Sequence, residues 1–191
     1  MLTLHLRDPF YSRLRSIVVY PHTYVPQSAA GVHSMTLQPK EETSRLGESW
    51  QHGAVVLSWD SARRDVADFH DGKNVVLHEF AHQLDQEHEG ADGVPVLPNS
   101  SAYRAWGRVM REDFLELREA VEDGERTVMN RYGATNPAEF FAVATECFFE
   151  KAEVLRRRHP ELYEELKGYY GQDPAGAGPV PEGGTPAGSA A

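Results

Sequence analysis

The chain has 191 residues, of which 40% are hydrophobic and 25% charged, as expected for a soluble globular protein with one sizeable core. Its formal net charge of −10 disfavours direct nucleic-acid binding, and the one basic run, at 156–158, is interpreted as a solvated helix end. We expect a cytoplasmic protein without membrane contact. There is no apolar stretch of roughly 18 residues, the first residues are unlike a signal peptide, and Cys147 is the only cysteine.

Short strands are predicted in the first part of the chain. Residues 16–20, SIVVY, and residues 54–59, AVVLSW, are apolar runs rich in β-branched side chains. A weaker strand is expected near 32–38, with loop or hairpin segments around it. Trp50 and Trp59 flank the second run and are expected in the core rather than on a substrate platform.

Helical periodicity begins after residue 70. A first helix is predicted over 73–86, followed by a long loop at 88–101. Apolar residues then recur at steps of three and four over 103–121, which predicts a long amphipathic helix. The buried stripe of the first helix is expected to contain Val76, Leu77, Phe80, Ala81 and Leu84.

Two further helices are predicted in the last third of the chain. One begins with the segment 135–150, with Asn136 as N-cap and Pro137 at the first helical position. The other covers 161–170. Strands followed by helices are typical of an α+β fold.

The chain is expected to form a single domain over 1–173. Residues 174–191 are nearly all Pro, Ala, Gly and Ser and have little to bury, so we expect a disordered tail.

A metal-binding motif lies in the first predicted helix. His78 and His82 are four residues apart, on one helix face, and two imidazoles at this spacing can bind one Zn²⁺. Glu79 completes the pattern H-E-x-x-H, in which the glutamate acts as general base. The alternative is a helix whose solvent face happens to be rich in histidine, but the apolar character of the other faces favours a packed helix.

Three residues compete to be the third protein ligand. His88 has nearly the metzincin spacing, although Asp85 stands where that motif has glycine. Glu139 begins the later helix, where it could instead cap the helix start, and Glu146 lies two turns further on. Asp85 shares the ligand face and is interpreted either as a group that orients His82 or as a surface carboxylate.

Several separate segments resemble one known family in the same order. HEFAHQLD, DGVP and YGATNPAEFFAVATECFFE, together with GESWQHGAVVLSWDSARRD before them, are similar to the Mlc titration factor A family of bacterial zinc peptidases. The likeness covers about residues 17–174. The shorter pattern also resembles the catalytic domain of anthrax lethal factor. The family usually carries a further, mainly helical N-terminal segment, and this chain begins where that segment would end.

The resemblance implies a zincin-like metallopeptidase domain and specific site residues. It implies that Glu139 is the third zinc ligand and that Tyr132 donates a hydrogen bond to the oxyanion of the substrate. The expected enzyme is a zinc peptidase with one Zn²⁺ held by His78, His82 and Glu139. Glu79 would take a proton from the attacking water and return it to the leaving amine.

The expected substrate is a peptide or protein, which could pair with the 54–59 strand. The resemblance also implies an aminopeptidase-like activity linked to the regulation of glucose uptake. One alternative is a binding protein that sequesters a transcriptional repressor of the Mlc type. Another is a degenerate zincin that only folds around its metal, although the intact Glu79 argues against it.

Overall fold

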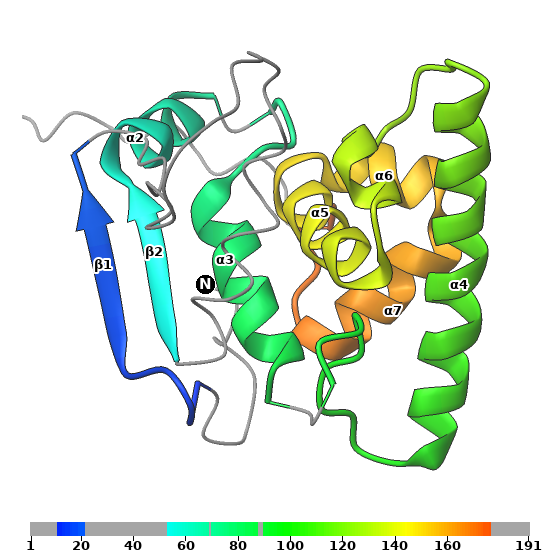
Figure 1. Cartoon of the computed structure of the whole chain (residues 1–191). Helices are drawn as coiled ribbons and strands as arrows, with labels where there is room; N and C mark the ends of the chain where they lie inside the picture. The colour runs from blue at the N-terminus through cyan, green and yellow to red at the C-terminus, as the bar shows by residue number, and fades with distance from the viewer. Residues whose placement is uncertain (1–10, 22–52, 69, 88–89, 177–191) are drawn as a thin grey trace, which may run out of the picture.

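The computed structural model describes residues 11–21, 53–68, 70–87 and 90–176 (Figure 1). The weak strand expected near 32–38, Trp50, His88 and most of the expected tail lie outside these ranges. Within them, no helix is long and apolar enough to cross a membrane.

Two short parallel strands form a sheet at one side of the molecule. Strand β1 (Ser16–Tyr20) pairs with β2 (Ala54–Ser58) in the register Ser16 with Ala54. The side chains of β2 alternate, so that Val55 and Leu57 are buried while the residues of β1 are exposed. Both predicted strands are therefore present.

The helix that carries the H-E-x-x-H motif packs directly against this sheet. Helix α3 (Val75–Asp85) contacts β2 on one side and α5 (Pro137–Glu150) on the other. Figure 1 shows the order from sheet to α3, then α5, and finally the long helix α4 (Ser100–Glu122). This order makes α3 an internal layer of a mixed α and β structure.

Burial along α3 differs from the predicted stripe. Ala81 and Leu84 are buried as expected, whereas Val76, Leu77 and Phe80 are only half-buried. The polar residues of the helix are buried instead, because α3 lies between two layers rather than on a surface. They are Glu79, His82, Gln83 and Asp85.

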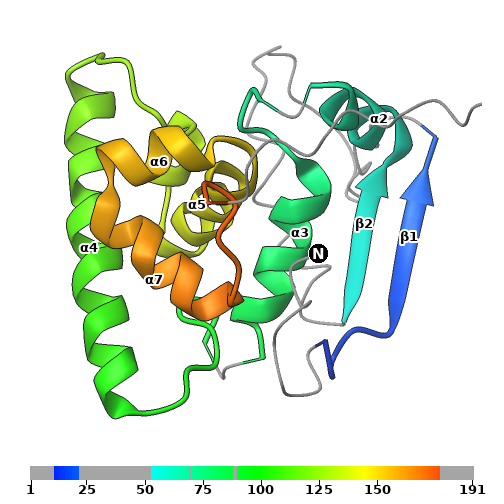
Figure 2. The ribbon, with the colours of Figure 1, turned by 180° about the vertical axis from the view of Figure 1, so that it is seen from behind.

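Helix α5 is the centre of the core. Asn136 caps its N-terminus by accepting a hydrogen bond from the Glu139 amide, and Pro137 occupies the first turn, as the sequence predicts. Its Phe141 packs edge-to-face on Trp106 of α4, and its Phe148 stacks on Tyr170. Figure 2, seen from behind, shows helices α6 (Ala152–Arg158) and α7 (Pro160–Tyr170) in front, beside α4 and α5.

Three short elements are not predicted as separate helices from the sequence, although the run at 156–158 is interpreted as a helix end. Helix α2 (Trp59–Ala67) follows β2 directly, capped by Ser58, whose hydroxyl accepts from the Ser61 amide at 3.3 Å. The other two are α6 and the 3₁₀ helix η1 (Arg131–Ala134). Because Trp59 begins α2 and is 54% exposed, its expected place in the core is wrong.

Candidate metal centre

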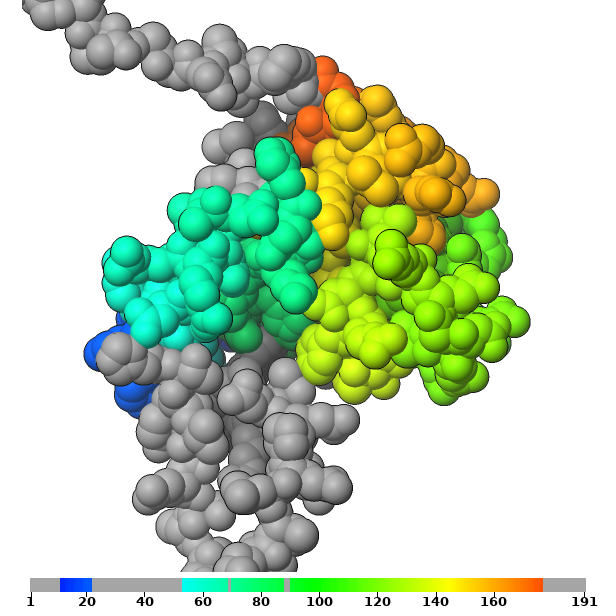
Figure 3. Space-filling model, turned by 90° about the horizontal axis from the view of Figure 1, so that it is seen from above, coloured from blue at the N-terminus to red at the C-terminus, as the bar shows by residue number. Residues whose placement is uncertain are grey.

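Side chains from α3 and α5 meet where the two helices pack together. The Nε2 atoms of His78 and His82 lie 3.2 Å apart, and Glu139 Oε2 lies 3.0 Å from the first and 3.3 Å from the second. Figure 3 shows the contact between the α2–α3 segment and the segment from η1 to α5 in the space-filling view. Three donor atoms, two nitrogens and one oxygen, thus point at one position.

The Glu139 side chain does not fold back over the helix start, although its position would allow a capping interaction. Its backbone amide donates to Asn136 Oδ1 at 3.0 Å, so the N-terminus of α5 is already capped. The carboxylate is left to face the two imidazoles.

Glu146 occupies a different position from the three converging groups. Its Oε1 lies 2.6 Å from His78 Nδ1, the ring nitrogen opposite the one that faces His82. Its Oε2 accepts the backbone N–H of Asn74, also at 2.6 Å. Asn74 is the N-cap of α3 and donates its side-chain amide to Glu150 Oε1 at 2.9 Å. Glu146 therefore orients the His78 ring and ties the start of α3 to α5.

Asp85 has a role that the sequence did not predict. Its Oδ1 accepts the backbone N–H groups of Gly93 and Val94, both at 2.9 Å, and the residue is fully buried. Asp85 is therefore neither the group that orients His82 nor the surface carboxylate considered from the sequence. Asp85 instead fastens the loop after α3 to the end of that helix.

This loop contacts the start of α5 closely at Gly93. Its φ is +81°, and a Cβ there would lie 2.4 Å from the carbonyl oxygen of Pro137. Its own carbonyl accepts the indole N–H of Trp106 at 2.9 Å. The loop thereby connects α3 and α4 to the first turn of α5, which carries Glu139.

The charges in the cluster are set by burial and by the carboxylates. Burial lowers the pKa of His78, but hydrogen bonds to Glu139 and Glu146 outweigh it and raise the pKa to about 10. Burial raises the pKa of Glu139, yet contacts with both imidazoles hold it at about 2. Burial lowers the pKa of His82. The cluster thus holds a proton on His78 in a place where a metal cation would compete with it.

Two further residues lie close to His78. Glu79 follows it in sequence, and the ring of Tyr132 lies beside its ring. Glu79 is 4% exposed, and its Oε2 has no hydrogen-bond partner among the described residues. Burial raises its pKa to about 8. The Tyr132 ring lies 6.0 Å from the His78 ring, centroid to centroid, on η1, whose start is capped by Asn130.

The residues present suit a metal ion. Imidazole nitrogens and a carboxylate oxygen are common ligands of divalent transition metals. Buried polar atoms normally have a hydrogen-bond partner. Glu79 Oε2 has none among the described residues, and a polar group bound beside the metal would supply one. Sequence reasoning missed Glu146 and Gly93 as supports of this site, although the spacing of Glu139 and Glu146 placed them on one helix face.

Comparisons with known proteins agree with this chemistry. A family model described as glucose-regulated metallo-peptidase M90 matches residues 1–171. The uncharacterized protein slr2042 of Synechocystis sp. is 39% identical over 174 residues, which are 91% of this chain and 63% of that protein. Mlc titration factor A of Serratia proteamaculans is 38% identical over 133 residues, covering 67% of this chain and 49% of the relative.

A third relative, Mlc titration factor A of Yersinia enterocolitica, is 33% identical over 168 residues, or 83% of this chain and 59% of that protein. The chain therefore spans between about half and 63% of the length of these relatives. The family match covers all of the residues from α3 to α5 that converge in the cluster. The chain belongs to the glucose-regulated metallo-peptidase M90 family.

Proposed function

We propose that the chain is a zinc-dependent peptidase with a zincin-like domain, in which His78, His82 and Glu139 hold one Zn²⁺. The observation that carries this proposal is the spacing of the three donor atoms, 3.0–3.3 Å. Ligands on a tetrahedral zinc at 2.0–2.1 Å lie about 3.3–3.4 Å apart, so the side chains need little movement to accept it. A bound zinc would polarise the scissile carbonyl and make a water acidic enough to attack it near neutral pH.

Glu79 is proposed as the general base. It lies within the same buried region, and its Oε2 is not engaged by another described residue. A pKa raised toward neutrality makes a carboxyl group suited both to accept a proton from water and to give it up again. Glu79 would therefore move the proton to the nitrogen of the leaving amine.

Tyr132 is proposed as the donor to the substrate oxyanion. Its ring lies beside His78, on the segment that precedes the helix of Glu139. A phenol hydrogen bond strengthens as negative charge develops on the carbonyl oxygen, so it stabilises the transition state more than the bound substrate.

Glu146 is proposed to fix the His78 tautomer. With His78 Nδ1–H donating to Glu146 Oε1, the Nε2 lone pair faces the position shared with His82 and Glu139. A metal ligand whose ring is held in this way does not have to be oriented when the metal binds.

The proposed substrate is a peptide bound in extended form. Among the described residues, β2 pairs with β1 on one side only, which leaves an edge that could pair with a peptide backbone. The family's description as a glucose-regulated metallo-peptidase supports peptidase activity and a link to glucose. We further propose, from the sequence resemblance alone, that the activity is aminopeptidase-like and acts in the regulation of glucose uptake.

A second role is proposed beside catalysis. Relatives named Mlc titration factor A support binding of a transcriptional repressor of the Mlc type. Such binding needs a surface rather than a metal. Purified repressor should therefore bind the zinc-loaded and chelator-treated chain equally, and no binding to either would remove this second role.

Peptide hydrolysis tests the first role. We expect cleavage that a chelator abolishes and zinc restores. Glu79→Gln should keep its zinc and lose about 10²–10⁴-fold in rate, since the amide cannot accept the proton. The matched control is Gln83→Glu, at another buried position of α3. The same peptide with an acetylated N-terminus should resist cleavage by an aminopeptidase. Near wild-type turnover by zinc-loaded Glu79→Gln would contradict the proposal.

A further inference from the structure

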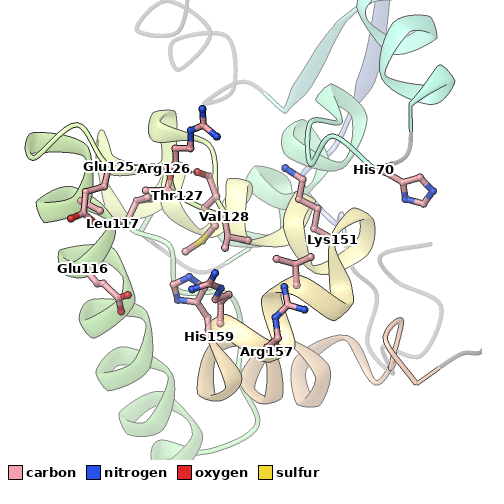
Figure 4. A pocket seen from close by; sticks show the side chains of 14 residues that line it. His70, Glu116, Leu117, Glu125, Arg126, Thr127, Val128, Lys151, Arg157 and His159 are labelled. Atoms are coloured by element: carbon pink, nitrogen blue, oxygen red, sulfur yellow. Dashed lines mark hydrogen bonds between the residues drawn. The ribbon is translucent and has the colours of Figure 1, made fainter.

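A cavity lies at the other end of α5 from the converging side chains. Its volume is about 590 Å³, within the usual range of small-molecule sites (Figure 4). Lys151, at its edge, follows Glu139 by twelve residues along α5, or about 18 Å at 1.5 Å per residue. The cavity is lined by residues from α4, α6 and the loop between α4 and η1, with His70 from the segment before α3.

Four cationic side chains line this cavity: Arg126, Lys151, Arg157 and Arg158. In the part of the chain that the structure describes, none of them forms an ion pair with a carboxylate. This is a local excess of positive charge in a chain whose formal net charge is −10. Unpaired cations that face one cavity favour an anionic ligand.

The two lining glutamates and Arg126 lie on one side of the cavity, and Lys151 and Arg157 lie on the other (Figure 4). The glutamates are Glu116 and Glu125. Apolar side chains complete the lining, namely Leu117, Val128, Met129 and Val154. A ligand that fits this pattern is anionic at one end and has an uncharged, hydroxylated or amine-bearing remainder.

The Lys151 side chain packs against the backbone of Gly72. Gly72 is buried with a φ of +72°, and a Cβ at Gly72 would lie 2.9 Å from Lys151 Nζ. The ammonium group therefore packs closely over a glycine, where any other residue would displace it.

We propose that this cavity binds a small organic phosphate, with the phosphate between Lys151 and Arg157. Arginine offers a planar pair of donors that matches a phosphate, and lysine adds a compact positive charge. The arginines of the run at 156–158, interpreted from sequence as a solvated helix end, thus include two that line a binding cavity. The competing explanation is that they only complement the negative C-terminal end of α6.

Calorimetric titration of the full chain tests the proposal. The probes are inorganic phosphate and adenosine monophosphate, with adenosine as the counterpart that lacks the phosphate. We expect saturable binding of both phosphates and none of adenosine. Arg157→Gln should weaken binding by at least about tenfold. The matched control is Arg104→Gln, an exposed arginine on α4 that does not line the cavity, and it should bind like the wild type.

A third variant separates this cavity from the proposed zinc site, which could itself bind phosphate. His82→Ala should retain binding of adenosine monophosphate, because the two sites are far apart along α5. Arg157→Gln should retain the wild-type melting temperature, since its side chain is exposed. No saturable binding, equal weakening by Arg157→Gln and Arg104→Gln, or loss of binding in His82→Ala alone would each overturn the proposal.

Discussion

Glu146→Gln is expected to weaken zinc binding, although glutamine is nearly the same size as glutamate. Both oxygens of Glu146 accept hydrogen bonds, one from the Asn74 backbone N–H and one from His78 Nδ1, each at 2.6 Å. Glutamine offers one oxygen and one NH₂ group, so it can accept only one of these bonds. The Asn74 N–H is always a donor and keeps the oxygen.

The NH₂ group then faces His78 Nδ1. Either two donors meet there, or the ring shifts its proton to Nε2, the atom that would bind the metal. Losing a hydrogen bond between charged groups costs about 1.5–3 kcal/mol. That corresponds to the 10–100-fold loss of metal affinity typical when a residue that orients a ligand is changed.

Competition with a chromophoric zinc chelator measures this effect. The matched control is Glu150→Gln, one turn further along α5, where Glu150 Oε1 accepts from the Asn74 side chain and Oε2 has no partner among the described residues. Glutamine can keep the bond from the Asn74 side chain, and the hydrogen bond to His78 Nδ1 comes from Glu146, so the control should bind zinc like the wild type. Equal zinc affinity of Glu146→Gln and the wild type would refute the orienting role.

Three other changes probe the support and chemistry of the site. Tyr132→Phe should lower kcat by about 10²–10³-fold with zinc content and KM unchanged, as steady-state kinetics on zinc-loaded protein would show; an unchanged kcat would leave Tyr132 as a packing residue. Gly93→Ala should lower the melting temperature by an amount equivalent to more than about 1 kcal/mol, since it combines a φ of +81° with a contact of 2.4 Å to Pro137; an unchanged melting temperature would contradict this. Zinc binding at pH 7 should release at least about one proton, because the pKa of His78 is raised to about 10 and a metal displaces its proton. The affinity for zinc should therefore rise with pH up to that pKa. Calorimetry in buffers of different ionisation enthalpy counts the proton, and a buffer-independent enthalpy would exclude it.

Helices whose sequence signal lies within one segment were predicted correctly. The helix of His78 and His82 is expected over 73–86 and runs from Val75 to Asp85, since a repeated apolar spacing is visible within one segment. The start of α5 follows from Asn136 and Pro137. Helix α2 was missed because a polar segment directly after a strand has little periodic signal, although Ser58 offered an N-cap.

Contacts between distant segments could not be predicted in the same way. Glu146 lies 68 residues from His78, and only the packing of α5 on α3 shows that it faces the second ring nitrogen. Asp85 was considered for the metal face, but its burial and its bonds to Gly93 depend on where the following loop returns. The place of Glu139 beside both histidines came from a family resemblance rather than from spacing.

Diffraction from crystals of the zinc-loaded chain, collected on both sides of the zinc absorption edge, locates the metal and identifies its ligands. The proposed zinc site predicts one strong anomalous peak within bonding distance of His78 Nε2, His82 Nε2 and a Glu139 oxygen, with Glu146 on His78 Nδ1. A peak bonded to His88 or Glu146 in place of Glu139, or no zinc between the two histidines, would contradict it.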